Sequence, residues 1–396
     1  MHVYVPYTAQ DPGSALTARR SVPRVKPLLV LAAVAAFLFL FLFYQSTEQA
    51  GSGISGKTFQ TTLPESLPAT LQATGQAVVD VSDEETTTSS DPFEELGRCT
   101  TLECVSALHP RLRASGSKFN YPHFFLAGWQ KSATTSIYRH LRHHPEIQVP
   151  LDKEPHYFSS CKFGAPACKV QGGFGNATDY LVSFLGLKEA AASKVGYATF
   201  DGSVDYAQKG EWLAPLLAKL FPWLRIVFVF REKVGRSMSY KNMLEEKFQR
   251  GCHGDVFKCL SASMSAWGSY AGSTKAWFEA FPASQVHAIQ FEELVEDPEG
   301  VLRRLKEFLG LDPEMPKRDL ANTNRRTSSG GWPIPRDDYE KLVDIAREDQ
   351  DGLLRVLEER VPGFDGDAWG RRWQKLWDRN FGTCEGSGMC TVASML

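Results

Sequence analysis

The sequence has almost no excess of charge of either sign. Among its 396 residues, 44 Lys and Arg nearly balance 46 Asp and Glu, which leaves a formal net charge of −2. Such a chain has no overall field that would attract nucleic acid, so we expect no nucleic-acid partner. Cysteine pairs with two intervening residues are also absent, which argues against a common zinc knuckle. No carboxylate cluster suited to a metal ion is evident, and we expect no metal.

Only one long hydrophobic run is present, at residues 28–44. As a helix it would be about 26 Å long, at the short end of a membrane span. Basic residues precede the run and only Glu48 follows it closely, which predicts a cytosolic tail at residues 1–27 and a lumenal remainder. A cleaved signal peptide is the alternative, but its apolar region would be shorter and nearer the start. We predict a type II signal anchor, and the short span suits the thinner membranes of the early secretory route.

Two segments of different composition follow the hydrophobic run. Residues 45–97 are rich in Ser, Thr, Gly and Glu and have too little apolar surface to fold alone, which predicts a disordered stem. Residues 98–396 are predicted to form a single lumenal domain. The sequence Asn176-Ala177-Thr178 is an N-glycosylation acceptor if that domain is lumenal.

All eight cysteines follow the apolar run, and an oxidising lumen makes disulfides plausible. Eight cysteines allow roughly a hundred pairings, which sequence alone does not resolve. The two middle pairs resemble local loop staples, whereas the two outer pairs could close locally or cross between the ends of the domain. The four close pairs are Cys99/Cys104, Cys161/Cys168, Cys252/Cys259 and Cys384/Cys390.

Predicted strands alternate with predicted helices through the domain. This alternation favours a doubly wound α/β fold with a P-loop-like central parallel sheet flanked by helices. Residues 224–230, apolar on both faces, suit a strand covered on both sides. The other predicted strands are residues 123–128, 196–202 and 285–291, and the predicted helices are residues 134–144, 234–248, 264–281 and 298–310.

The segment after the first predicted strand has the features of an anion site. Lys131 supplies a charge, Thr134, Thr135 and Ser136 supply hydroxyls, and the following helix offers free N–H groups at its positive end. An ordinary Thr cap beside a solvated lysine fits this segment equally well. The G-x-x-x-x-G-K-[ST] phosphate loop is absent, which argues against an ATP-using kinase.

The letters K-S-A-T-T-S-I-Y-R-H-L resemble the 5′-phosphosulfate loop, K-x-G-T-T-x-L, of sulfotransferases that use PAPS (3′-phosphoadenosine 5′-phosphosulfate). The resemblance implies that the loop binds PAPS as the sulfate donor. Ala133 stands where that family usually has glycine, and alanine fits only if its φ stays negative. The donor-binding residues implied are Lys131, Ser132, Ala133, Thr134, Thr135 and Ser136.

A second motif of the same family is an Arg and a Ser eight residues apart after a strand. Arg231 ends the strongest predicted strand and Ser239 follows at that spacing, which implies a site for the 3′-phosphate of PAPS. A helix-entry salt bridge to Glu232 is the alternative for Arg231. Arg325 and Arg326 lie in a later basic loop that resembles the family's donor-closing loop, although a solvated loop fits them equally.

Lys153-Glu154-Pro155-His156-Tyr157-Phe158 resembles the K-E-x-H-F-F segment of heparan-type sulfotransferases. The resemblance implies Glu154 as the catalytic base, with His156 as the fallback and Lys131 stabilising charge on the bridging oxygen. A surface turn is the alternative. Residues 201–206 resemble the family's E-x-S-P-x-Y segment, which implies that Ser203 approaches the donor or acceptor.

The resemblance covers about residues 120–330 and is closest to Golgi-type carbohydrate sulfotransferases, including heparan sulfate N-sulfotransferases and N-acetylgalactosamine 4-sulfate 6-O-sulfotransferase. It implies metal-free, in-line transfer of sulfuryl from PAPS to a hydroxyl or amino group of a glycan. The alternatives are a tyrosine sulfotransferase and a non-catalytic lumenal glycan-binding protein on the same fold, which Ala133 favours. A polyanionic acceptor would need basic residues, and the candidates, which also fit a solvated helix face, are Arg139, Arg142, His143, His144, Lys241, Lys247 and Arg250.

Overall fold

The computed structural model separates the chain into two units, Met1–Glu84 and Glu85–Leu396, and only the second contains described residues. The predicted tail and span, Cys161, Cys168, Arg325 and Arg326 lie outside the described residues. In the part that is described, no helix is both long and apolar enough to cross a membrane. The described ranges are 91–159, 176–192, 196–266, 268–316, 331–384, 386 and 388–392.

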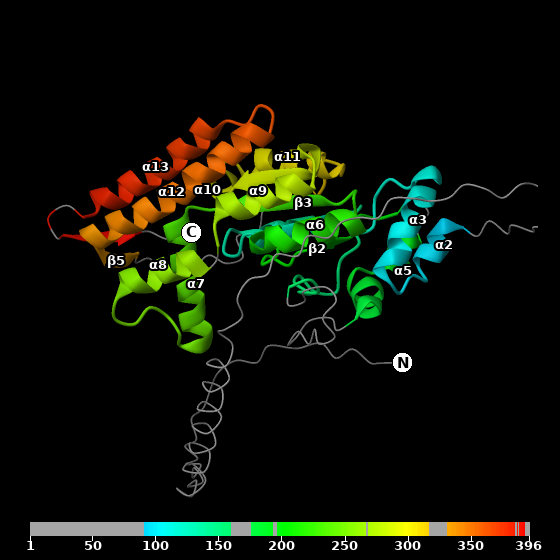
Figure 1. The fold of residues 1–396 in the computed structure, drawn as a ribbon, viewed down its shortest axis with the longest axis horizontal. Helices are drawn as coiled ribbons and strands as arrows, with labels where there is room; N and C mark the ends of the chain where they lie inside the picture. The colour runs from blue at the N-terminus through cyan, green and yellow to red at the C-terminus, as the bar shows by residue number, and fades with distance from the viewer. Residues whose placement is uncertain are drawn as a thin grey trace, which may run out of the picture. The chain divides into compact units, whose positions relative to one another are not determined.

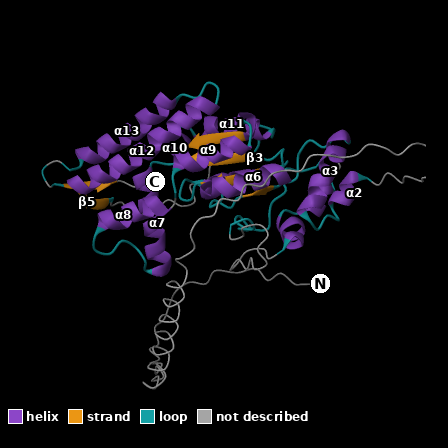
Figure 2. Ribbon diagram, in the orientation of Figure 1, coloured by secondary structure: helices purple, strands orange, loops and turns teal. Residues whose placement is uncertain are grey.

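A sheet of four parallel strands lies at the centre of this unit, with helices on both faces (Figures 1 and 2). The strands are β1 (Phe124–Gly128), β2 (Phe200–Asp201), β3 (Arg225–Phe230) and β4 (Val286–Gln290), in the order β2-β1-β3-β4. All three neighbouring pairs are parallel. The predicted central parallel sheet flanked by helices is therefore confirmed, although β2 is shorter than the predicted strand at residues 196–202.

The two faces of the sheet pack against different helices because successive side chains on a strand point to opposite sides. On β3, Phe228 and Phe230 face a core that includes α6 (Gly210–Leu220) and α9 (Tyr270–Ala280). Val227 and Val229 face a second core. That core includes α4 (Thr134–Leu141) and α11 (Pro298–Leu309). Burial on both sides explains why the β3 sequence is apolar throughout.

The predicted helix at residues 264–281 is wrong as a single element. It is divided into α8 (Val256–Ala266) and α9. Gly268 adopts a φ of +72° between them, and the Ser269 side chain caps α9 by accepting a hydrogen bond from the Gly272 N–H. The remaining elements are α2 (Pro92–Leu96), α3 (Leu102–Ala114), η1 (Asp179–Phe184), α5 (Leu187–Ala191), η2 (Ala207–Lys209), α7 (Lys233–Phe248), η3 (Ala283–Gln285), α10 (Phe291–Glu296), β5 (Trp332–Pro335), α12 (Arg336–Arg360), α13 (Gly366–Gly382) and β6 (Met389–Val392).

The folded part of the chain begins earlier than the predicted boundary between residues 97 and 98. Helix α2 lies within the range assigned to the stem, and its Phe93 and Leu96 are buried. The Asp91 side chain caps α2 by accepting a hydrogen bond from the Phe93 N–H at 2.9 Å. Burial of these apolar side chains stabilises this short helix through tertiary packing.

The disulfides in the described ranges are all local. Cys252–Cys259 forms the predicted staple between α7 and α8. The outer pairs, for which local closure and a long crossover were both open, close as Cys99–Cys104 and Cys384–Cys390. Cys390 lies in β6, so the last of these disulfides joins the two-stranded sheet of β5 and β6 to the residues that follow α13.

Gly128 allows the end of β1 to lie close to the segment that follows β2. A Cβ atom at this position would lie 2.5 Å from the Val204 carbonyl oxygen and 2.6 Å from the Ala207 Cβ. We therefore expect Gly128→Ala to lower the free energy of unfolding by about 1–3 kcal/mol or more, because backbone must move to admit the methyl group. Urea unfolding followed by circular dichroism measures this change.

Gly116→Ala is the matched control for Gly128→Ala. Gly116 also has a positive φ, +84°, but a Cβ there would have nothing within 4 Å. Its substitution therefore carries only the backbone cost of about 1–2 kcal/mol. Equal losses from the two substitutions would show that the contact with residues 204–207 is not what requires Gly128.

Candidate functional site

The strand order places the loops after β1, β2 and β3 at one edge of the sheet. The chain passes from β1 to β2 on one side and then from β2 to β3 on the other side of β1. Ligands of open α/β sheets bind at the carboxyl ends of the strands, where the order reverses in this way. Lys131, Ser203 and Arg231 each follow one of these three strands.

The loop at residues 131–136 ends in the N-terminus of α4. Ala133 occupies the capping position without a side-chain hydrogen bond, and its carbonyl accepts from Ser136 N–H at 2.9 Å and Ile137 N–H at 3.2 Å. Thr134 and Ser136 are buried, and Ser132 is completely buried with a hydroxyl that has no hydrogen-bond partner among the described residues. The first turn of a helix has N–H groups without intrahelical partners and a positive dipole end. The loop therefore has the donors that an anionic group requires.

Ala133 does not meet the condition under which alanine was expected to fit the loop, a negative φ. Its φ is +62° and its ψ is +14°, in the left-handed region. Lys131 also has a positive φ, +69°. This conformation costs a non-glycine residue about 1–2 kcal/mol, and glycine avoids most of that cost. The loop thus follows a path suited to glycine even though residue 133 is alanine.

Arg231 contacts the loop directly. Its Nη1 donates a hydrogen bond to the Lys131 carbonyl oxygen at 3.0 Å, although the two residues are 100 positions apart in the chain. The guanidinium carbon also lies 4.4 Å from the centroid of the Phe291 ring. Arg231 is buried, and burial lowers the pKa of its guanidinium, with Glu292 and Glu232 opposing this effect. The two predicted donor motifs are therefore adjacent.

Two buried glutamates lie behind Arg231. Glu232 caps α7 by accepting from the N–H groups of Val234 at 2.8 Å and Gly235 at 2.6 Å. The Glu292 carboxylate accepts from the Glu232 N–H at 2.9 Å. Burial raises the pKa of Glu292 to about 7 and also raises the pKa of Glu232.

Helix α13 supports both glutamates, and the sequence analysis did not identify this contribution. Trp373 Nε1 donates to Glu292 at 3.0 Å, and Trp377 Nε1 donates to Glu232 at 3.0 Å. Figure 1 shows α13 running beside α12. Trp369, Trp373 and Trp377 recur every four residues, which places them on one helix face. That spacing could have indicated a buried aromatic stripe, but not its polar partners.

Ser239 lies in the second turn of α7 and is half-buried. Its predicted contact with a phosphate stays a prediction.

Glu154 and His156 lie beside the end of β2, where the Gly202 N–H donates to the Lys153 carbonyl at 3.1 Å. Glu154 forms an ion pair with Lys153, and its other carboxylate oxygen lies 3.5 Å from His156 Nε2. The His156 backbone N–H donates to the Ser203 hydroxyl at 2.9 Å. The structure therefore brings Glu154, His156 and Ser203 together at the end of β2. This strand neighbours β1, which precedes the loop at residues 131–136.

His156 is oriented by Asp205, a residue of the segment 201–206 for which the resemblance implied no role. His156 Nδ1 lies 2.9 Å from Asp205 Oδ1. Ser159 donates to the same oxygen at 2.8 Å, and Lys209 pairs with the other one. The hydrogen bond to Asp205 raises the pKa of His156, with burial opposing it. Burial acts to raise the pKa of Asp205. The hydrogen bonds that the Asp205 carboxylate accepts from His156 and Lys209 outweigh burial and hold this pKa below its usual range.

We expect Asp205→Asn to lower the pKa of His156, because burial then acts without the carboxylate that opposes it. Wild-type protonation of His156 adds stability below pH 6.5, and this is lost as pH rises through the raised pKa. The Asp205→Asn variant should not show this fall in stability as pH rises above 6.5. Titration of the His156 ring by NMR measures the change, with Lys209→Met as the control that keeps the carboxylate. An unchanged pKa in Asp205→Asn would contradict this account.

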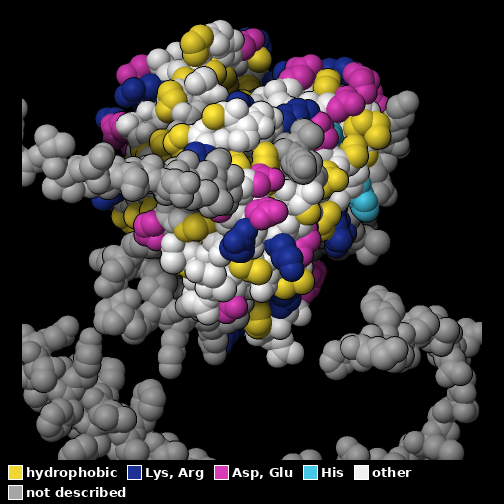
Figure 3. Space-filling view, turned by 90° about the vertical axis from the view of Figure 1, so that its right-hand side faces the viewer, with side chains coloured by type: hydrophobic (Ala, Val, Ile, Leu, Met, Phe, Trp, Pro, Cys, Tyr) yellow, Lys and Arg dark blue, Asp and Glu magenta, His cyan; other side chains and the backbone are white. Residues whose placement is uncertain are grey.

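The basic residues considered for a polyanionic acceptor do not all face solvent. His144 is buried and its Nε2 lies 2.9 Å from the Asp312 carbonyl oxygen, so a role in acceptor binding is wrong for this residue. Arg139, Arg142, Lys247 and Arg250 are exposed. Figure 3 shows one face of the molecule, on which Lys and Arg side chains lie among Asp and Glu side chains.

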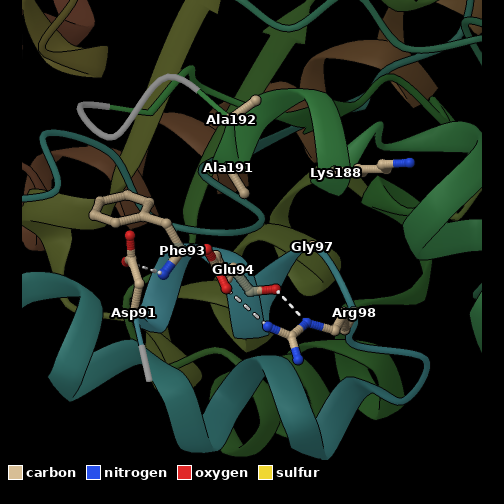
Figure 4. A pocket seen from close by; sticks show the side chains of 8 residues that line it. All are labelled: Asp91, Phe93, Glu94, Gly97, Arg98, Lys188, Ala191 and Ala192. Atoms are coloured by element: carbon tan, nitrogen blue, oxygen red, sulfur yellow. Dashed lines mark hydrogen bonds and ion pairs between the residues drawn. The ribbon is translucent and has the colours of Figure 1, made fainter. Parts of the chain in front are cut away.

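A hollow of about 400 Å³ lies between α2 and α5 (Figure 4). In Figure 1 these helices lie to the right of the sheet, whereas α7, which follows β3, lies to its left. Arg98 reaches toward Glu94 in the hollow and pairs with its carboxylate at 3.0 Å. Two of the charged side chains that line the hollow therefore pair with each other. Across the described ranges, no group of three or more His, Cys, Asp or Glu side chains could hold a metal ion.

The known proteins to which this chain is similar are sulfotransferases. Residues 203–315 match a family model described as the sulfotransferase family, and this range includes Arg231 and Ser239 but not the loop at residues 131–136. Mouse (Mus musculus) heparan sulfate glucosamine 3-O-sulfotransferase 3B1 is 27% identical over 206 residues, which cover 50% of this chain and 48% of that protein. Mouse carbohydrate sulfotransferase 15 is 23% identical over 300 residues, covering 59% of this chain and 52% of that protein.

The chain spans about half the length of the curated relatives it matches. A crystal structure of a sulfotransferase from Alicyclobacillus acidocaldarius overlaps with a TM-score of 0.48 and 24% identity, covering 63% of this chain and 99% of that chain. That overlap is low, and the fold assignment comes from the strand order instead. The sequence matches confirm the predicted resemblance to carbohydrate sulfotransferases and support a sulfotransferase enzyme.

Proposed function

We propose that this chain is a sulfotransferase and that it transfers a sulfuryl group from PAPS to a hydroxyl or amino group of a glycan. The observation that carries the proposal is the 3.0 Å hydrogen bond from Arg231 to the Lys131 carbonyl, since it joins the two motifs that would hold one nucleotide. The names of the matched relatives, which refer to heparan sulfate and carbohydrate, support a glycan as the acceptor class.

In the proposed donor site the two anionic ends of PAPS are bound by different segments. The loop from Lys131 to Ser136 would bind the 5′-phosphosulfate through N–H groups, hydroxyls and the Lys131 ammonium. Arg231 and Ser239, with Arg325 and Arg326 from the later loop, would bind the 3′-phosphate. Burial of the Ser132 hydroxyl, which has no hydrogen-bond partner among the described residues, favours such a role, because buried polar groups need partners.

In the proposed reaction Glu154 removes the proton from the acceptor hydroxyl. The acceptor oxygen forms a bond to sulfur as the bond from sulfur to the bridging phosphate oxygen breaks. The electron pair stays on the leaving phosphate of adenosine 3′,5′-bisphosphate, where Lys131 stabilises the developing charge. The 3.5 Å approach of His156 to Glu154 makes His156 the fallback for the proton. No step requires a metal.

The proposed location is the Golgi membrane, as a type II single-pass protein anchored by residues 28–44 with a glycosylated lumenal domain. The local disulfides support an oxidising compartment. Asn176 is exposed at the start of η1, which supports its use as a glycosylation site.

The test incubates the purified full chain in detergent with PAPS carrying a labelled sulfate and a panel of acceptors. The panel contains heparan sulfate, chondroitin sulfate, desulfated forms of both, a neutral glycan and a tyrosine peptide. We expect label in at least one glycan and none in the peptide, with Lys131→Ala as the inactive control. Label in the peptide alone would identify a tyrosine sulfotransferase. Glycan binding with no transfer to any acceptor would identify a non-catalytic protein.

A further inference from the structure

Helix α7 carries a second buried arginine, Arg236, which the sequence analysis did not include among the donor residues. Its side chain is 2% exposed, and its Nε and Nη2 atoms have no hydrogen-bond partner in the part of the chain that the structure describes. The guanidinium lies 5.6 Å from the centroid of the Trp129 ring and 5.2 Å from that of Tyr270. Arg236 is therefore held by two aromatic rings while one edge of its guanidinium makes no hydrogen bond.

A buried guanidinium with no counter-charge is unfavourable. Aromatic faces contribute only about 0.5–2 kcal/mol, whereas the effective cost of burying an ion is several kcal/mol. Asp349 already accepts from Lys233 Nζ at 2.6 Å and from the Tyr270 N–H at 2.8 Å. Glu232 accepts from the N-terminus of α7 and from Trp377. The acidic groups around Arg236 in the described ranges thus have other partners, which leaves its charge available to an anionic ligand.

Three residues near Arg236 connect it to the proposed donor site. It lies three residues before Ser239, so both residues occupy the same face of α7. Trp129 comes directly after β1 and just before the loop that begins at Lys131. The Tyr270 hydroxyl donates to the Arg231 carbonyl oxygen at 3.0 Å. Each neighbour of Arg236 is therefore attached to a segment of that site.

We propose that Arg236 binds the 3′-phosphate of the nucleotide together with Arg231. This inference rests on the proposed use of PAPS. The unpaired Nε and Nη2 atoms lie on the same edge of the guanidinium, which is the edge that donates two parallel hydrogen bonds to a phosphate. A 3′-phosphate carries more than one negative charge, so a pair of arginines matches it better than Arg231 alone.

The test compares two nucleotides that differ only in the 3′-phosphate. Binding of adenosine 3′,5′-bisphosphate and of adenosine 5′-monophosphate is measured by isothermal titration calorimetry for the wild type and for Arg236→Gln. We expect Arg236→Gln to weaken the bisphosphate roughly 30-fold or more and to leave the monophosphate nearly unchanged. Lys258→Gln, which removes an exposed positive charge from α8, should leave both affinities as in the wild type.

Arg236→Lys covers the case in which Arg236→Gln does not fold. Lysine keeps the charge but lacks the fork, so we expect it to retain part of the preference for the bisphosphate. A wild-type ratio of the two affinities in a folded Arg236→Gln or Arg236→Lys variant would overturn the role of Arg236 while leaving PAPS as the donor. A wild-type protein with no preference for the bisphosphate would overturn both this inference and the proposed donor.

Discussion

Replacing Arg231 by alanine is expected to abolish sulfuryl transfer because the donor no longer binds. The substitution removes a buried guanidinium from the junction of the two motifs and leaves the Lys131 carbonyl without that donor. Loss of one charged partner from a buried pair costs about 2–5 kcal/mol, which corresponds to a fall in donor affinity of roughly 30-fold to several thousandfold. Calorimetry with adenosine 3′,5′-bisphosphate measures the affinity, and labelled PAPS measures the transfer.

Arg231→Lys is the matched control, because it keeps the charge beside Glu232 and Glu292 but loses the forked geometry. We expect it to bind the donor with intermediate affinity. Thermal unfolding of each variant separates loss of binding from loss of the fold. Wild-type donor affinity in a folded Arg231→Ala protein would show that Arg231 does not hold the nucleotide.

Replacing Glu154 by glutamine is expected to reduce the transfer rate by about 10²–10⁴-fold while donor affinity stays as in the wild type. Glutamine keeps the size and one oxygen of the side chain but does not accept the acceptor's proton. We expect an effect on the rate but not on donor affinity because Glu154 lies in the segment beside β2. The proposed donor residues instead follow β1 and β3. Single-turnover transfer from labelled PAPS measures the rate, and calorimetry measures the affinity.

His156→Asn is the companion substitution, because His156 Nε2 lies 3.5 Å from Glu154. If Glu154 is the base, His156→Asn should lose less activity than Glu154→Gln. Wild-type transfer by Glu154→Gln together with an inactive His156→Asn would assign the base to His156 instead.

The sequence was sufficient to predict the sheet and the meeting of the two motifs. The strand at residues 224–230 is apolar on both faces, and such a strand requires helices on both sides. Once the strands are parallel, their carboxyl ends lie at one edge, which brings the segments at Lys131 and Arg231 close together. Arg231 and Lys131 are in contact although they are 100 residues apart in the sequence. The family resemblance was needed to single out these two residues within their segments.

The residues that support the site were not predictable in the same way. Asp205, Trp373 and Trp377 act through tertiary contacts that no local spacing reveals. The left-handed conformation of Ala133 is another case, because alanine disfavours it locally and surrounding structure must impose it. Arg236 was overlooked for a related reason: its burial and its lack of partners are properties of the packed α7, Trp129 and Tyr270 together.

A crystal structure of the protein with adenosine 3′,5′-bisphosphate tests the central claim most directly. The account predicts one nucleotide whose 5′-phosphate lies on the N–H groups at the start of α4 and whose 3′-phosphate lies against Arg231. A nucleotide bound elsewhere, or one that contacts the α4 loop while its 3′-phosphate points away from Arg231, would contradict it.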